Sequence, residues 1–242
     1  MTIEDKYPPP LELFKTELKT FEFIYTRSHL FAPYYSELIS EISTQYSRLK
    51  AKINKERRID LFTRLSIVLD HKEYNTGKAL LGIDIARDGG KYQQVSYSVT
   101  ICRTGGDNES DRILRKYHFD YTSAQGSSGR QPHPVFHLQY AGKLSKHHIS
   151  LDLDHTHITC DSWLSEPRIS IAPMSYALML NMVFKEFPDE VNQRIIETPE
   201  WRSLVKTNED IFLKPYFEHC STFLNKRSTN LLTNDFWYGH NE

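Results

Sequence analysis

The spacing of apolar residues changes twice along the chain, and these changes limit the folds open to it. Up to Ile53 apolar side chains recur every three or four residues, which predicts two amphipathic helices, the second starting at Pro33. From Asp60 to about residue 158 they recur every second residue, which predicts strands with one apolar face. Helical spacing returns at Pro173. The sequence therefore predicts an α+β fold, with an antiparallel sheet of about five strands flanked by N-terminal and C-terminal helices.

Turn-forming and helix-capping residues place the boundaries of these elements. Asp88-Gly89-Gly90 separates two alternating runs and predicts a hairpin. Alternation over 116–121 and 135–140 predicts two further strands, with a continuation through 149–153. Three C-terminal helices are expected, over 174–187, from Thr198-Pro199 onward, and over 209–224 with a kink or interruption at Pro215.

Length and composition favour one folded domain over residues 1–242. The chain has 242 residues, of which 39% are hydrophobic and 12% aromatic, enough to bury a core. No linker is long enough to force a domain boundary. We expect a helix pair over 1–58, the sheet over 60–158, helices over 172–224 and a tail over 225–242.

Cysteine usage and hydropathy indicate a reducing compartment. The three cysteines lie about sixty residues apart, without a C-x-x-C pair, so neither a disulfide framework nor a zinc or redox motif is expected. The first ten residues are polar and proline-rich, and no window has the apolar length needed to cross a bilayer. We therefore expect a cytoplasmic protein that does not bind membranes.

Basic residues are concentrated at the end of the second predicted helix. The formal net charge of −1 gives the whole chain no attraction for nucleic acid, so such binding needs a local patch. The run that could form one is Arg48, Lys50, Lys52, Lys55, Arg57 and Arg58. It could contact a nucleic acid or nucleotide through phosphates, or it could be the solvated end of a helix.

Seven of the eleven histidines lie between residues 118 and 157, and strand alternation turns this excess into a geometric expectation. If Tyr117 and Phe119 face the core, His118 and Asp120 share the opposite face, and the same reasoning places His137 and Gln139 together. If the two strands pair, these four side chains converge on one polar face.

Two kinds of chemistry fit such a face. In the first, His118 and His137 act as general acid and base, Asp120 orients one imidazole, and Arg168 stabilises an anionic transition state, as a metal-independent ribonuclease requires. His133, Gln139 and Lys116 would then bind the ligand. In the second, a divalent metal is bound, with further candidates in a D-x-D-H-x-H run at Asp152, Asp154, His155 and His157. The alternative to both is an ordinary polar sheet surface, on which Asp120 pairs with a neighbouring cation.

Short motifs in this region resemble those of a group of bacterial proteins of unknown function, some of them associated with toxin–antitoxin or phage-defence loci. The motifs are Lys116-x-His118-x-Asp120-Tyr121, His133-Pro134-x-x-His137, Gly142, and Pro167-Arg168 followed by Ala172-Pro173 and a buried helix. They cover about seventy residues. The chain has Arg168-Ile169-Ser170 where that group has R-I-P. The resemblance implies a bacterial cytoplasmic context and a shared fold, without an established activity or cofactor.

Two functional hypotheses follow. The first is a component of a bacterial defence or toxin–antitoxin system whose histidine-bearing sheet face binds or cleaves a phosphate-bearing ligand, either RNA or a nucleotide. The second is a non-catalytic subunit that docks a larger protein partner in a multi-component system. Its docking surfaces would be the N-terminal helices and the aromatic tail with Phe236, Trp237 and Tyr238.

Overall fold

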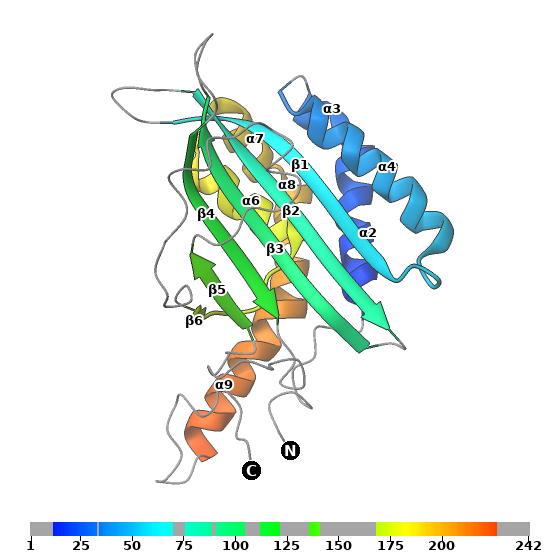
Figure 1. Cartoon of the computed structure of the whole chain (residues 1–242), viewed down its shortest axis with the longest axis vertical. Helices are drawn as coiled ribbons and strands as arrows, with labels where there is room; N and C mark the ends of the chain where they lie inside the picture. The colour runs from blue at the N-terminus through cyan, green and yellow to red at the C-terminus, as the bar shows by residue number, and fades with distance from the viewer. Residues whose placement is uncertain are drawn as a thin grey trace.

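A six-stranded antiparallel meander forms the centre of the protein (Figure 1). The computed structural model describes residues 12–32, 34–69, 76–88, 91–104, 112–121, 136–140 and 168–226. The strands are β1 (Arg58–Val68), β2 (Thr76–Asp88), β3 (Lys91–Arg103), β4 (Arg112–Tyr121), β5 (Phe136–Tyr140) and β6 (Arg168–Ser170), and they pair in chain order. The predicted α+β class and antiparallel sheet are confirmed.

The boundaries of the sheet differ from the prediction at both ends. The first strand begins at Arg58, at the end of the basic run, and the last strand is the three-residue β6. The predicted continuation through 149–153 lies outside the described residues, as does the aromatic tail. The hairpin expected at Asp88 is confirmed by the pairing of Asp88 with Lys91.

Helices precede and follow the sheet as expected, with two that the prediction missed. The N-terminal helices are α2 (Leu13–Thr26), the short α3 (Ser28–Phe31) and α4 (Ser36–Lys52). The C-terminal ones are α6 (Tyr176–Glu186), α7 (Glu190–Glu197), α8 (Pro199–Asn208), the π-helical turn η2 (Glu209–Leu213) and α9 (Lys214–Lys226). The missed α3 and α7 have four and eight residues, too few for the apolar period to show.

The interruption expected at Pro215 takes the form of the π-helical turn. Proline has no N–H to donate to the carbonyl four residues before it, so an α-helical ladder cannot continue through it unchanged. Immediately before Pro215, the N–H of Lys214 donates to the carbonyl of Glu209, five residues back. The helical axis therefore continues into α9, which projects beyond the sheet (Figure 1).

The two faces of the sheet have different surroundings. Helices α2, α6, α7 and α8 lie behind the sheet in Figure 1, and the alternate apolar residues of β1 to β4 are buried against this layer. No helix of the described residues covers the opposite face, although Thr100, Lys116 and His137 on that face are buried. Helix α4 lies beside the β1 edge, where Gln45 Nε2 and Arg48 Nη2 donate to the carbonyls of Asp60 and Arg58. These contacts satisfy backbone groups that an open edge strand would expose.

A buried carboxyl joins three elements inside the helical layer. Glu17 of α2 is fully buried, and its Oε1 accepts hydrogen bonds from the Tyr97 hydroxyl at 2.6 Å and from the backbone N–H of Tyr176 at 3.1 Å. Its Oε2 is buried and makes no hydrogen bond with the described residues. Burial raises the pKa of Glu17 to about 7, although the hydrogen bonds from Tyr97 and Tyr176 lower it in part. The protonated carboxyl is therefore the form that the folded protein favours up to near-neutral pH.

We predict that Glu17 makes the protein less stable as the pH rises from 4.5 to 7. Because the folded protein holds this proton more tightly than the unfolded chain does, the stabilisation is complete below about pH 4.5 and is lost as the pH rises through 7. The loss amounts to about 3 kcal/mol. Glu17→Gln removes the ionisable group. Its free energy of unfolding relative to the native protein, measured by chemical denaturation, should therefore rise between pH 4.5 and 8.

A second variant shifts the pKa of the same carboxyl instead of removing the carboxyl. Tyr97→Phe removes a hydrogen bond that favours the ionised form, so the loss of stability should move to higher pH. If the difference between Glu17→Gln and the native protein is the same at pH 5 and pH 8, the assignment of this pH dependence to Glu17 is wrong.

Candidate functional site

The two strands that carry the predicted site residues are neighbours. Strand β4 pairs with β5, and in this register His118 lies opposite Gln139 and Asp120 lies opposite His137. Directly opposed residues of an antiparallel pair project from the same face, and residues two apart on a strand do so as well. The expected convergence of these four residues on one polar face is therefore confirmed, although their roles stay predictions.

The register extends this arrangement into two rows that cross the sheet. The histidine row contains, from β1 to β6, Phe62, Gly82, Ser98, His118, Gln139 and Arg168. The adjacent aspartate row contains Asp60, Asp84, Ser96, Asp120, His137 and Ser170. Four of the predicted residues thus have polar neighbours on β1, β2 and β3 that the sequence analysis missed. The same alternation argument, applied to these strands, would have found Asp60, Asp84, Ser96 and Ser98.

His118 lies at one end of a groove of about 290 Å³ on this face. The groove crosses β1 to β4, and its polar lining comes mainly from the two rows. Among the residues that line it, Ser98 lies opposite His118 on the adjacent strand, and Ser96 lies two residues before Ser98. His118 is partly exposed, so its imidazole can reach a ligand bound in the groove.

The opposite end of the groove is organised by an arginine–carboxylate pair. Arg58 donates to both oxygens of Asp84, at 2.9 and 2.7 Å, and Gln94 Nε2 donates to Asp84 Oδ2 at 3.0 Å. The hydrogen bond to Asp84 and its negative charge raise the pKa of Arg58. This bidentate geometry fixes the position of both side chains. Asp60 lies opposite Asp84 on β1 and also lines the groove.

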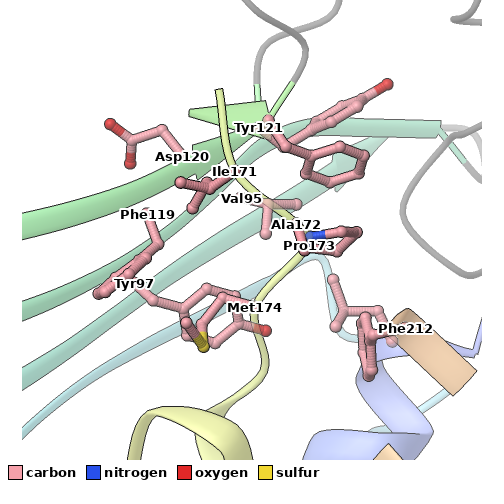
Figure 2. A pocket seen from close by; sticks show the side chains of 12 residues that line it. Val95, Tyr97, Phe119, Asp120, Tyr121, Ile171, Ala172, Pro173, Met174 and Phe212 are labelled. Atoms are coloured by element: carbon pink, nitrogen blue, oxygen red, sulfur yellow. The ribbon is translucent and has the colours of Figure 1, made fainter. Parts of the chain in front are cut away.

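His137 shares this face but is buried. Its side chain is 3% exposed, and its Nε2 lies 3.9 Å from Asp120 Oδ2, which is longer than a hydrogen bond. Figure 2 shows Asp120 directed away from the apolar pocket formed by Phe119, Tyr97 and Met174 on the helical side. That pocket holds only about 10 Å³ of free volume, so it offers no room for a ligand larger than water. Asp120 and His137 do not line the groove. Of the two histidines, His118 is therefore the one that can contact a ligand in it.

The remaining predicted residues fall into two groups. Lys116 lies one row beyond His118 and is 1% exposed, so its ammonium does not line the groove. The backbone of Arg168 pairs with Gln139, which gives Arg168 its register position at the β6 end of the histidine row. His133 and the run with Asp152, Asp154, His155 and His157 lie outside the described residues. Within the described parts of the chain, no cluster of three or more His, Cys, Asp or Glu residues could hold a metal ion.

Several members of the basic run have partners within the protein. Arg48 contacts Glu56 at 3.7 Å, Arg57 contacts Asp88 at 3.9 Å, and Lys50 donates to the Tyr46 hydroxyl at 3.1 Å. That hydrogen bond raises the pKa of Lys50. Lys52 and Lys55 are exposed. Arg58 is the one member of the run that lines the groove, so the groove receives one cation from this segment.

Comparisons with protein-family models, with curated proteins and with solved structures found no match. Among the described residues, no helix combines the length and the apolar character needed to cross a membrane.

We predict that the two histidines of the paired strands respond differently to substitution. His118→Ala should change the free energy of unfolding by less than about 0.5 kcal/mol, because this partly exposed side chain lies at a groove. His137→Ala should lower the free energy of unfolding by about 1–3 kcal/mol, because it removes a buried ring that lies beside Asp120. Chemical denaturation of both variants measures the difference. Equal losses would show that both side chains serve the fold.

Proposed function

We propose that the polar face of the sheet binds a phosphate-bearing ligand, either RNA or a nucleotide, in the groove beside His118. The observation that carries the proposal is the position of His118, partly exposed in a groove of about 290 Å³ that Ser96 and Ser98 also line. An imidazolium and two hydroxyl donors are groups that bind phosphate oxygens.

Binding is better supported than cleavage. Cleavage by general acid–base catalysis needs two proton-transfer groups that reach the substrate, and of the two predicted imidazoles one is buried. Asp120 stands beside that buried histidine and would orient it. His118 would then bind the ligand. It would also transfer a proton if the ligand or another residue supplied the second proton-transfer group.

The proposed biological setting rests on the resemblance of short motifs described above. We propose that the chain is a component of a bacterial defence or toxin–antitoxin system and acts in the cytoplasm. Strand β4 carries the first of those motifs and β5 the last histidine of the second, and His118 of β4 lines the groove.

Binding is tested with the full chain, using fluorescence anisotropy with single-stranded RNA and equilibrium dialysis with ribonucleotides. We expect His118→Ala to weaken binding at least tenfold, and affinity to fall as salt is raised if phosphates are contacted. Ser66→Ala is the matched control, because Ser66 is exposed on the same face of β1 but outside the groove.

Two results would count against this function. One is native protein that binds neither RNA nor nucleotide. The other is equal loss of binding in His118→Ala and Ser66→Ala. The metal content of the native protein is first measured by elemental analysis. Labelled RNA is then incubated with the native protein and with His118→Ala, which shows whether cleavage accompanies binding.

Helix α9 favours a second function, that of a subunit docking a larger protein. It projects from the sheet, and its Phe217 and Leu224, seven residues apart and therefore on one side of the helix, are 57% and 48% exposed. Tyr216 anchors the base of the helix by packing against Phe136, with ring centroids 6.1 Å apart. Exposed aromatic and aliphatic side chains on one helix face are typical of contact surfaces for protein partners.

This second function predicts loss of partners when the exposed face is made polar. The double variant Phe217→Ser/Leu224→Ser should remain folded and should lose proteins that crosslink to the native chain in its own cells. His118→Ala is the control, because it removes the proposed ligand contact and leaves α9 intact. Recovery of the same crosslinked proteins with the double variant would contradict docking through α9.

A further inference from the structure

A second cavity lies on the helical side of the sheet, between α6 and strands β3 to β5, and is called the α6 cavity below. Its free volume is about 260 Å³. The strands line it with apolar and aromatic side chains that include Tyr117, Phe119 and Leu138, and α6 and the residue after it add Met182, Val183 and Phe187. Tyr117 and Phe119 alternate with His118, so the α6 cavity and the groove lie on opposite faces of the sheet.

The protein covers the apolar walls of the α6 cavity only in part. Several of its lining side chains are half-buried, namely Tyr117, Leu138, Met182 and Phe187. The same rows continue to the edge of the sheet, where Tyr140 lies opposite Tyr117 and Ile169 lies opposite Leu138. Tyr140 and Ile169 are 47% and 55% exposed. Partly exposed apolar walls around an open volume favour the binding of an apolar ligand, because its burial removes more apolar surface from water.

The volume of the α6 cavity sets the size of the ligand. An apolar cavity of about 150 Å³ can take up benzene, which has six carbon atoms. In proportion, the volume of about 260 Å³ holds an apolar body of roughly ten carbon atoms. Met182 is unbranched and can change its rotamer, so the wall that it forms can adapt to an aliphatic or to an aromatic body.

An ion pair in the lining determines the charge of the ligand. Arg115 Nη1 donates to Glu186 Oε1 at 3.3 Å, and the two side chains are 54% and 57% exposed. A single contact between such exposed groups contributes little free energy. A guanidinium has five N–H donors in a planar fork and can give two parallel hydrogen bonds to a carboxylate. A ligand carboxylate would therefore gain a stronger contact with Arg115 than the one it displaces, whereas an ammonium at Glu186 has no such bidentate geometry.

We propose that the α6 cavity binds a small carboxylic acid with an apolar body of about ten carbon atoms, the body against Tyr117, Leu138 and Met182 and the carboxylate at Arg115. This site goes beyond the proposed function, because it lies on the other face of the sheet and needs no phosphate. The shared chemistry is an apolar carboxylate, which a medium-chain fatty acid and a bicyclic aromatic acid both supply. Glu186 takes the place that the ligand carboxylate would occupy.

Isothermal titration calorimetry of the full chain with decanoate, 1-naphthoate, decanol and decylammonium tests the proposal. We expect at least one of the two acids to bind about tenfold or more tightly than decanol and decylammonium, the gain typical of hydrogen bonds to a charged group. The heat capacity change of binding should be negative, because apolar surface is buried. Tighter binding of decanoate indicates a fatty acid, and tighter binding of 1-naphthoate indicates an aromatic acid.

Substitutions of the two charged residues should act in opposite directions. Arg115→Gln should weaken binding of the preferred acid about tenfold or more and change that of decanol less than about twofold. Glu186→Gln removes the competing acceptor and its negative charge, so the acid should bind about threefold more tightly. Arg194→Gln is the matched control, because it makes the same change at an exposed arginine of α7 outside the cavity. An ion pair that served only the fold would give both variants of the pair the same sign of effect.

Filling the α6 cavity tests where the apolar body lies. Leu138 is half-buried and lines the cavity, so the larger side chain of Leu138→Trp should occupy this volume and abolish binding of both acids and of decanol. The denaturation midpoint of the variant shows whether it is folded. Met182→Phe fills the same volume from α6 and replaces Leu138→Trp if that variant does not fold.

Three results would overturn the inference. The first is native protein that binds neither acid, whatever its affinity for RNA or nucleotides. The second is binding of the acid that persists in a folded cavity-filling variant. The third is an equal effect of Arg115→Gln and Arg194→Gln, or a preference for decylammonium over both acids. None of these results bears on the groove at His118, so this inference and the proposed function fail separately.

Discussion

The register of the antiparallel sheet is the constraint on which the site depends. Side chains alternate with a period of two, so a slip of one residue in a strand pair would turn one set of side chains to the helical side. The two register shifts in the sheet lie between Ala86 and Arg87 and between Ile101 and Cys102. Both are outside the histidine and aspartate rows, which therefore cross β1 to β6 without interruption.

The apolar side of the same strands explains why this register is maintained. The alternate residues of β1 to β4 pack against α2 and α6, and exchanging them with the polar set would bury carboxylates in hydrocarbon. Glu17 shows what such burial does: its pKa is raised to about 7 even with two hydrogen bonds to one oxygen. The apolar packing thus selects the register, and the register in turn assembles the polar face.

Sequence periodicity was sufficient for the fold class and for part of the site. It identified the meander, the hairpin at Asp88 and the shared face of His118 and Asp120, because these follow from local alternation and turn chemistry. It missed α7, whose eight residues are too few to show a period. It also failed to distinguish His118 from His137, since alternation assigns a side chain to a face but says nothing of what covers it there.

Burial separates two histidines that alternation makes equivalent. They are diagonal neighbours on one face, which places their Cα atoms roughly 7–8 Å apart, yet one lines a groove and the other is 3% exposed. The groove runs from His118 toward β1, away from His137 and Asp120. A ligand that follows this space toward the β1 edge of the sheet meets Asp60 and the Arg58–Asp84 pair. The chemistry of the groove therefore depends on the charged groups at that end as well as on the one histidine that lines it.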